Sequence, residues 1–182
     1  MSLKNKKIVL PGGSGYIGRH LSRHFVAKGY DVVVLSRSEG ELSDCVRYVW
    51  WDGANLDAWA NEIDGADVVI NLSGRSINCR YTKKNRQQIY DSRENSTQVV
   101  GEAITQAKEP PRVWLNASAA TIYRHSLDRD MDEATGELQY VEPGRPKDKW
   151  EFSVDVVNRW EEALFNADTS STRRIAMRLS MV

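Results

Sequence analysis

Four glycines within seven residues end the first apolar run of the chain: Gly12, Gly13, Gly15 and Gly18. Residues 8–10 predict a strand before them, and the fourfold spacing of Ile17, Leu21 and Phe25 predicts a helix behind them. A strand, a glycine-rich turn and a helix, in that order, form the context in which such a turn binds the pyrophosphate of a dinucleotide. The phosphate charge would lie at the helix N-terminus, beside unpaired N–H groups and the positive end of the dipole.

The glycines have separate tasks in this interpretation. Gly12 and Gly13 would form the tight turn, and Gly15 would let the backbone approach the pyrophosphate. Gly18 would let the helix pack closely on the strand. The residues between them complete the predicted binding turn: Ser14, Tyr16 and Ile17. A purely structural strand–helix turn is the alternative, so the rest of the chain must support binding.

Composition narrows the classes of function. The chain has 182 residues, with 25 basic and 25 acidic side chains and a net charge of zero. A neutral total argues against a general nucleic-acid or acidic-membrane surface. No apolar run approaches the ~20 residues that span a bilayer, so we expect a cytoplasmic protein without membrane contact. Cys45 and Cys79 form no CxxC pair, and His20 and His24 lack an acidic partner, so no metal site is expected.

Strand and helix patterns alternate along the chain. Strands are predicted near residues 8–10, 32–35, 46–50, 66–70, 113–115 and 174–179, and further helices at 56–63, 82–107 and 153–165. Such alternation predicts an α/β fold, a doubly wound parallel sheet of the Rossmann type with helices on both faces. Right-handed crossovers and the leading glycine turn predict the strand order 3-2-1-4-5-6. We expect residues 1–182 to form one domain, and the long connection 124–149 to be functional or mobile.

The end of the second strand favours one cofactor over another. Arg37 lies 19 residues after Gly18, where an NAD-binding fold usually carries an acidic residue on the ribose hydroxyls. A carboxylate would repel a 2′-phosphate, whereas arginine pairs with it bidentately. NADP(H) is therefore predicted over NAD(H), with Ser36 and Arg37 as its ligands. An ordinary surface arginine is the alternative.

Two further turns follow strands at the predicted carboxyl edge. Asp52 could accept a hydrogen bond from the adenine amino group, or could serve only its own turn. Leu72, Ser73 and Gly74 follow the fourth strand. Ligands of open α/β sheets bind along that edge, so these three residues are predicted to meet the cofactor.

The same motifs, in this order, resemble the short-chain dehydrogenase/reductase superfamily. Within it the chain is similar to the atypical sugar-nucleotide-epimerase-like group, the NAD-dependent epimerase/dehydratases. The residues that carry the resemblance are the glycine turn 12–18, the turn 71–74, Ser92-Arg93, Pro110-Pro111, residues 117–123 and Arg159-Trp160-Glu161. The resemblance implies that Arg93 lies near the cofactor and that Val182 approaches the nicotinamide. It also implies a small-molecule substrate, a homodimer formed around Gln98 and Trp160, and a C-terminal substrate lobe that this chain lacks.

The chain departs from the superfamily at its usual catalytic residues. No tyrosine is followed by lysine four positions later; the aligned tyrosine and lysine positions hold Ser153 and Val157, and the serine position holds Ala119. In the superfamily, the lysine lowers the tyrosine pKa for proton exchange during hydride transfer. Ser118 and Tyr123 are the substitute candidates for catalysis. The alternative interpretation is that Tyr123 is a structural residue in the core or at its rim.

Two functions follow from these patterns. The first is an NADP(H)-binding epimerase/dehydratase-like oxidoreductase that transfers hydride to or from a hydroxyl or carbonyl carbon, with nucleotide sugars among its candidate substrates. The second is a catalytically silent NADP(H)-binding redox sensor or scaffold, which the altered catalytic positions favour. Nucleic-acid binding on the same fold is a third hypothesis, and the neutral charge counts against it.

Overall fold

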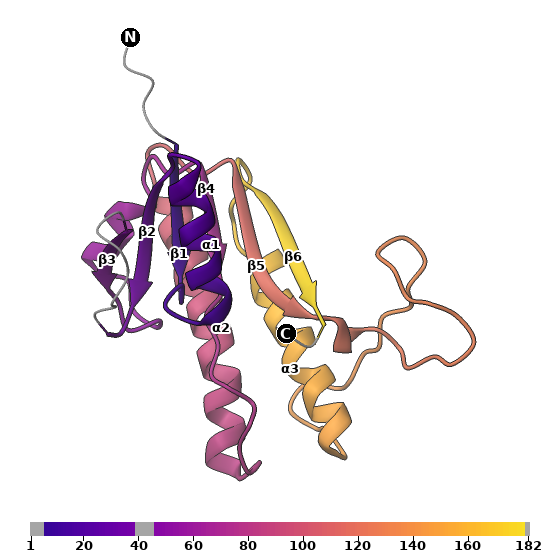
Figure 1. Cartoon of the computed structure of the whole chain (residues 1–182). Coiled ribbons are helices and arrows are strands. Elements are labelled where there is room, and N and C mark those ends of the chain that lie inside the picture. Colours follow the sequence, from indigo (N-terminus) through magenta and orange to yellow (C-terminus); the bar gives the residue numbers. More distant parts are fainter. Residues whose placement is uncertain (1–5, 39–45, 181–182) are drawn as a thin grey trace.

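A six-stranded parallel sheet forms the centre of the molecule (Figure 1). The structure is a computed structural model that describes residues 6–38 and 46–180. The strands are β1 (Lys7–Pro11), β2 (Asp31–Ser36), β3 (Val46–Trp50), β4 (Val68–Asn71), β5 (Val113–Ala119) and β6 (Arg173–Leu179). Their order is β3-β2-β1-β4-β5-β6, which confirms the predicted Rossmann topology.

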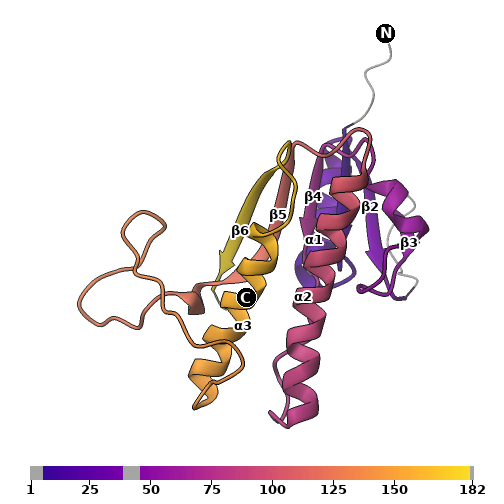
Figure 2. The same ribbon diagram turned by 180° about the vertical axis from the view of Figure 1, so that it is seen from behind.

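Helices cover both faces of this sheet, as the alternating pattern predicted. The helix α1 (Tyr16–Ala27) lies on one face, and α2 (Lys83–Gln106) and α3 (Lys149–Phe165) lie side by side on the other (Figures 1 and 2). Two short 3₁₀ turns, η1 (Ala58–Glu62) and η2 (Ala120–Ile122), complete the elements. The lower part of α2 extends past the carboxyl edge of the sheet in Figure 1.

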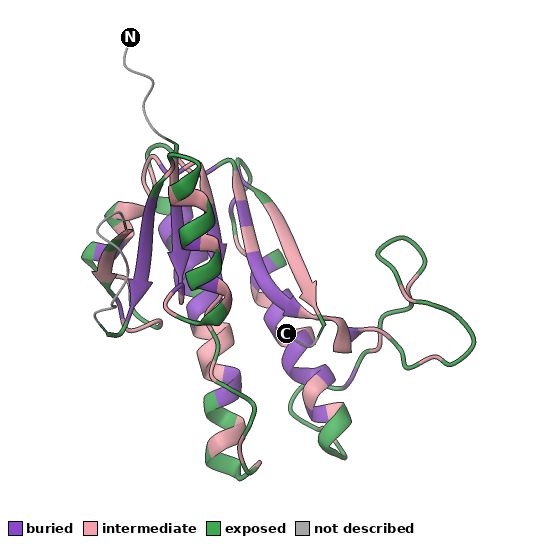
Figure 3. Cartoon of the chain, in the orientation of Figure 1, coloured by how far each residue is buried: buried purple, intermediate pink, exposed green. Residues whose placement is uncertain are grey.

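The core has one apolar layer on each face of the sheet. Alternate residues of β1 and β2 pack toward opposite faces: Val9 and Val33 contact the layer under α2 and α3, whereas Ile8 and Val32 contact the layer under α1. All four side chains are buried. In Figure 3, most of β1 and β2 has the colour of buried residues. Burial on both faces explains why β2 reads as an unbroken apolar run.

Two boundaries differ by four residues from the predicted ones. The fifth strand continues to Ala119 because it pairs with β6 along its whole length. The helix α3 begins at Lys149 rather than Ser153, because the Asp148 carboxylate accepts a hydrogen bond from the Glu151 N–H at 2.8 Å. The predicted helix 56–63 is only the 3₁₀ turn η1, capped by the Asp57 side chain.

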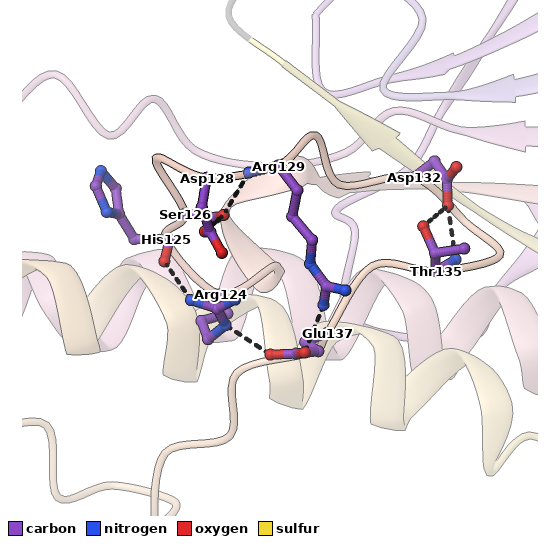
Figure 4. Close-up of polar contacts among 8 residues, drawn as sticks. All are labelled: Arg124, His125, Ser126, Asp128, Arg129, Asp132, Thr135 and Glu137. Carbon is purple, nitrogen blue, oxygen red and sulfur yellow. Dashed lines mark hydrogen bonds and ion pairs between the residues drawn. The ribbon is translucent and has the colours of Figure 1, made fainter.

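The long connection after β5 divides into an arm (residues 124–138) and a strap (residues 139–148). The arm projects away from the sheet (Figure 1), and its Glu137 carboxylate pairs with Arg124 and Arg129 (Figure 4). The strap lies against α3. Asn158 accepts from the Val141 N–H at 3.2 Å, and Asp155 accepts from the Gly144 N–H at 3.1 Å.

Candidate functional site

The glycine turn joins β1 to α1 with little free volume around three of its glycines. A Cβ atom on Gly18 would lie 2.2 Å from the Gly13 carbonyl oxygen, and one on Gly13 would lie 2.7 Å from the Leu10 Cβ. Gly12 has a φ of +72°, and an added Cβ would meet the Ser73 backbone at 2.8 Å. Gly15 differs, because its nearest neighbour would be the Gly12 carbonyl oxygen at 3.7 Å. The backbone at Gly15 is therefore open to a ligand.

The first turn of α1 has no side-chain partner for its backbone N–H groups. Gly15 is its N-cap, no side chain makes a capping hydrogen bond, and no acidic residue stands in the first turn. Unpaired N–H groups and the positive end of the dipole form an anion site. Tyr16 begins the helix with an exposed ring that contacts the His20 ring edge-on at 4.7 Å.

A cavity of about 620 Å³ opens over this turn at the carboxyl edge of the sheet. The predicted cofactor ligands that line it are Gly12, Ser14, Gly15, Ser36, Arg37, Asp52, Leu72, Ser73 and Gly74. Further lining residues are Ser38, Trp51, Gly53, Ala54, Arg75, Gln88, Asp91, Ser92, Asn95 and Ser96. Five segments that are far apart in sequence thus meet around one cavity. The predicted ligands that do not line it are Gly13, Tyr16, Ile17, Gly18 and Arg93. Val182 lies outside the described residues.

Hydroxyl groups and Arg37 form one end of the cavity. The buried Ser36 hydroxyl donates to the Ser14 hydroxyl at 3.1 Å and accepts from the Ser38 N–H at 3.2 Å. Arg37 follows directly, and it is exposed at the cavity lip. An arginine and several small donors are the groups that hold a phosphate monoester in proteins.

Asp52 is engaged in its own turn. Its carboxylate accepts from the backbone N–H groups of Ala54 at 2.8 Å and Asn55 at 2.9 Å, and from the Asn55 side-chain amide at 2.6 Å. The Asn55 amide, with these N–H groups, lowers the Asp52 pKa. This geometry favours the turn interpretation, and the adenine contact stays a prediction. The buried indole of Trp51 lines the cavity beside it.

Ser73 brings an unpaired polar atom to the turn. Its hydroxyl oxygen is buried and has no hydrogen-bond partner among the described residues, while its N–H donates to the Asn71 side chain at 3.1 Å. A buried polar atom without a partner costs free energy unless a ligand or water satisfies it. This hydroxyl lies against Gly12, and Ser73 is one of the residues that line the cavity.

Arg93 lies behind the cavity wall. Its guanidinium lies 5.0 Å from the Trp160 ring centroid and donates to the carbonyl oxygens of Arg75 and Ile89. Burial lowers the Arg93 pKa to about 10, which still leaves it a cation at neutral pH. A Cβ added to Gly74 would lie 3.4 Å from its Cζ, so Arg93 supports the wall at that glycine.

The two catalytic candidates meet in one charged network. The buried Ser118 hydroxyl donates to the Glu161 carboxylate at 2.6 Å. Arg178 donates to both oxygens of Glu161 at 2.9 Å. A third N–H of Arg178 donates to the Tyr123 hydroxyl at 2.9 Å, with the guanidinium 5.0 Å from the Tyr123 ring centroid. The hydrogen bond to Glu161 is the main cause of a raised Arg178 pKa.

The sequence motifs did not reveal Arg178, and they gave Glu161 no role in the site. Arg178 is far from Tyr123 in sequence and becomes its neighbour only through the pairing of β5 with β6. One signal was available in the sequence. Arg174, Ala176 and Arg178 alternate along a predicted strand, so their side chains share one face of the sheet, and both faces are expected to be covered by helices. A charge at such a position needs a buried partner.

The usual catalytic positions of the resemblance take other roles. Ser153 is half-buried on α3, where its hydroxyl donates to the Lys149 carbonyl oxygen at 3.1 Å. Val157 is buried in the core. Within the described residues, no group of three or more potential metal ligands converges, and no helix is both long and apolar enough to cross a bilayer.

Comparison with known proteins agrees with this arrangement. Residues 8–147 match the model of the NAD dependent epimerase/dehydratase family. An epimerase family protein of Staphylococcus saprophyticus, SSP1921, is 33% identical over 97% of this chain and 55% of its own length. YfhF of Bacillus subtilis is 37% identical over 74% of this chain and 45% of its own length. The chain spans about half the length of these relatives.

Solved structures show the same fold. The human epimerase family protein SDR39U1, solved with NADPH, has a TM-score of 0.75 and 27% identity, and the match covers 94% of this chain and 52% of that protein. MoeE5, solved with UDP-glucose and NAD, has a TM-score of 0.73 at 18% identity, and covers 94% of this chain and 53% of its own.

Proposed function

The chain belongs to the NAD dependent epimerase/dehydratase family, and from this membership we propose that it binds NADP(H) and acts in hydride transfer. The observation that carries the proposal is the cavity above the glycine turn, which is lined both by Gly15, whose backbone is open, and by Ser73, whose buried hydroxyl has no partner among the described residues. The helix N-terminus at Gly15 would hold the pyrophosphate. The NADPH bound to human SDR39U1 supports this choice of ligand.

The 2′-phosphate would lie at Arg37. The adjacent hydroxyls of Ser36 and Ser14 bind each other, and the Ser38 N–H completes a group of donors at that end. NAD(H) would lose the arginine contact and bind less tightly.

Neither candidate lines the cavity, and of the two Tyr123 has the freer proton for exchange with a small-molecule substrate. Ser118 is buried, and its hydroxyl proton is committed to Glu161. The Tyr123 oxygen instead accepts from Arg178, which leaves the phenol proton free and puts a positive charge beside the oxygen. The Arg178 N–H would keep the oxygen hydrogen-bonded while the proton is exchanged. The bound cofactor would supply or accept the hydride.

The substrate would carry a hydroxyl or carbonyl carbon, and nucleotide sugars are the class to test first. A silent redox sensor is the second candidate function, and the specific observation that favours it is Val157, which is buried where the superfamily has its lysine. Deuterium transfer from labelled NADPH to a panel of nucleotide sugars and simple carbonyls, using the full-length gene product, separates the two. Tight NADPH binding with no transfer to any of them would favour the sensor.

The cofactor assignment has a direct test by isothermal titration calorimetry. Arg37→Ala should weaken NADPH binding by about 1–3 kcal/mol, roughly fivefold to 150-fold, and should spare NADH. Arg23→Ala is the control, because Arg23 is an exposed arginine on α1 that does not line the cavity. Equal losses for both cofactors would contradict the 2′-phosphate assignment.

We also propose a homodimer through the exposed faces of α2 and α3. A groove of about 460 Å³ runs between these helices, and Gln98, Glu102 and Arg159 are among its lining residues. Sedimentation velocity tests it: Gln98→Arg should shift a dimer to a monomer. A wild-type monomer at micromolar concentration would contradict the proposal.

A further inference from the structure

A line of buried polar side chains runs from α3 to the turn that follows β4. It begins at Trp160 on α3 and passes through Thr97 on α2, Asn116 on β5 and Asn71 on β4. None of these side chains belongs to a residue that is more than 6% exposed. A buried polar network whose members are all hydrogen-bonded fixes one arrangement of those members.

Hydrogen bonds join these side chains one after another. The Trp160 Nε1–H donates to the Thr97 hydroxyl at 3.1 Å, and that hydroxyl donates to the Asn116 Oδ1 at 3.4 Å, the longest contact of the line. The Asn71 Nδ2 donates to the same Asn116 oxygen at 2.7 Å. The Asn71 Oδ1 accepts from the Ser73 N–H at 3.1 Å, so the line ends at the backbone of a residue that lines the cavity.

The direction of each hydrogen bond follows from the indole at the start of the line. An indole N–H can only donate, so the Thr97 hydroxyl accepts there and has its own proton left to donate. The Asn116 amide turns its oxygen toward that proton, and its Nδ2 donates to the Ala117 carbonyl oxygen at 2.9 Å. Asn71 must then present its NH₂ to the Asn116 oxygen, which leaves its own oxygen for the Ser73 N–H. A reversed Asn71 amide would place a donor against the Ser73 N–H.

A second contact connects Trp160 to the same turn. The Arg93 guanidinium lies 5.0 Å from the Trp160 ring centroid and donates to the Arg75 carbonyl oxygen at 3.2 Å. A Cβ added to Gly74 would lie 3.4 Å from the Arg93 Cζ. The ring therefore supports the guanidinium that packs on the far side of Ser73, while its N–H acts on the near side.

The conformation of this turn affects the glycine turn beside it. A Cβ added to Gly12 would lie 2.8 Å from the Ser73 hydroxyl oxygen, so the two turns are in direct contact. Both Gly12 and Ser73 line the cavity. A change in the Ser73 backbone would therefore alter two of the segments that meet around the cavity.

We infer that Trp160 is a positioning residue for cofactor binding, because it sets the orientation of the Asn71 amide and with it the conformation of the Ser73 turn. The inference rests on the proposed function, since it concerns the binding of NADP(H). Trp160 is buried on α3 and does not line the cavity, so it acts through the residues between them and not by contact with the cofactor.

The first measurement is the NADPH affinity of the full-length gene product by isothermal titration calorimetry. Thr97→Val replaces the hydroxyl by a methyl group and should weaken NADPH binding about threefold to tenfold, the net effect of one lost hydrogen bond. Thr97→Ser keeps the hydroxyl and should bind as wild type does. Trp160→Phe keeps a ring beside Arg93 but removes the N–H, and should lose as much as Thr97→Val. The double variant should bind no more weakly than the weaker single variant, because both changes break one line.

Two variants match these changes elsewhere in the core. Thr172→Val removes a buried hydroxyl that donates to the Pro111 carbonyl oxygen at 2.7 Å, at the amino ends of β5 and β6. Trp114→Phe removes a buried indole N–H that has no partner among the described residues. Neither control should change the affinity for NADPH. Thermal unfolding by circular dichroism verifies that each variant is folded.

The second measurement needs no cofactor. Hydrogen exchange followed by mass spectrometry reports on the backbone N–H groups of residues 72–75 in the cofactor-free protein. Thr97→Val and Trp160→Phe should each speed exchange in this turn at least about threefold and leave β1 and β2 as in wild type. A side chain that only stabilises the core would instead speed exchange across the whole sheet.

Three results would overturn the inference. In the first, Thr97→Val and Trp160→Phe bind NADPH as wild type does. In the second, the controls Thr172→Val and Trp114→Phe lose as much affinity, or exchange rises across the whole sheet. In the third, the losses of the two single variants add in the double variant. Failure of the wild type to bind NADPH counts against the proposed function alone, and exchange in residues 72–75 then decides whether Trp160 sets the turn.

Discussion

The two parts of the sheet's carboxyl edge are built in different ways. Between β1 and α1, backbone segments pack directly against one another. The turn can adopt this conformation because Gly12, Gly13 and Gly18 have no side chain. At β5 and β6, side chains supply the structure, through the hydrogen-bonded network of Glu161 and Arg178. The first arrangement fails when an atom is added, and the second fails when a charge is removed. The cofactor end thus depends on shape, and the proposed proton-exchange end depends on electrostatics.

The largest effect should come from an added side chain at the turn. Gly18→Val would force Cβ to within 2.2 Å of the Gly13 carbonyl oxygen, and backbone cannot move aside as a flexible side chain can. We expect a loss of about 3 kcal/mol or more in the free energy of unfolding, measured by urea denaturation. Gly15→Ala is the matched control, because its nearest neighbour lies at 3.7 Å; it should stay folded but bind NADPH more weakly. A wild-type urea midpoint for Gly18→Val would refute the steric account.

The next effect should come from a deleted charge at the other end. Arg178→Met leaves the Glu161 carboxylate, only 8% exposed, without its cation. Removal of one partner of a buried pair costs about 3–5 kcal/mol, and the 19% exposure of Arg178 reduces this to about 2 kcal/mol. The double variant Glu161→Gln/Arg178→Met should regain part of the loss, as a double-mutant cycle would show. If the two single losses simply add, the pair is not coupled.

A smaller effect should appear at the contact between α2 and α3. The Tyr90 hydroxyl donates to the buried Asp155 carboxylate at 2.5 Å, and burial followed by this hydrogen bond raises the Tyr90 pKa. Tyr90→Phe should cost about 1–2 kcal/mol at neutral pH. A tyrosine whose pKa is higher in the folded state stabilises the fold below its unfolded pKa of about 10 and loses that stabilisation as pH rises toward the folded value.

The pH dependence of Tyr90 gives a second measurement on the same variant. Urea unfolding of wild type and Tyr90→Phe should show a stability difference that is constant from pH 7 to about 9 and shrinks above pH ~10. If the stability difference between wild type and Tyr90→Phe grows as the pH rises above ~10, the phenol is not the donor to Asp155.

The smallest effect should come from the exposed turn at Asp52. Asp52→Ala removes the acceptor for two backbone N–H groups and the Asn55 amide. Because the carboxylate is solvated, we expect a loss below about 1 kcal/mol. A carboxylate whose pKa is lowered in the folded protein stabilises the fold at pH values above its ordinary pKa. This stabilisation is lost as the pH falls through the lowered pKa. The difference in free energy of unfolding between wild type and Asp52→Ala should therefore disappear in acid. A difference that stays the same in acid would mean that the Asp52 carboxylate is not its cause.

Local patterns predicted the first part of the edge well. The glycine spacing and the unbroken apolar run of β2 are properties of neighbouring residues, so the strand order and the turn follow from the sequence alone. The start of α3 was missed because Asp148 was not recognised as a cap within the polar connection. The partner of Tyr123 could not be derived, because Arg178 reaches it only through the β5–β6 pairing. The alternation along β6 indicates that Arg178 needs a buried partner, but it does not identify that partner.

The position of Trp51 gives the cofactor cavity an optical reporter of its own. All six tryptophans belong to the described residues, and Trp51 alone among them lines that cavity. Its ring lies edge-on to Trp59 with centroids 5.3 Å apart, in a buried setting that holds both indoles still. A dinucleotide that enters the cavity would change the fluorescence emission of Trp51 directly. Occupancy of the cavity can therefore be followed by intrinsic fluorescence, without a label. Trp51→Phe would keep an aromatic wall and remove the signal.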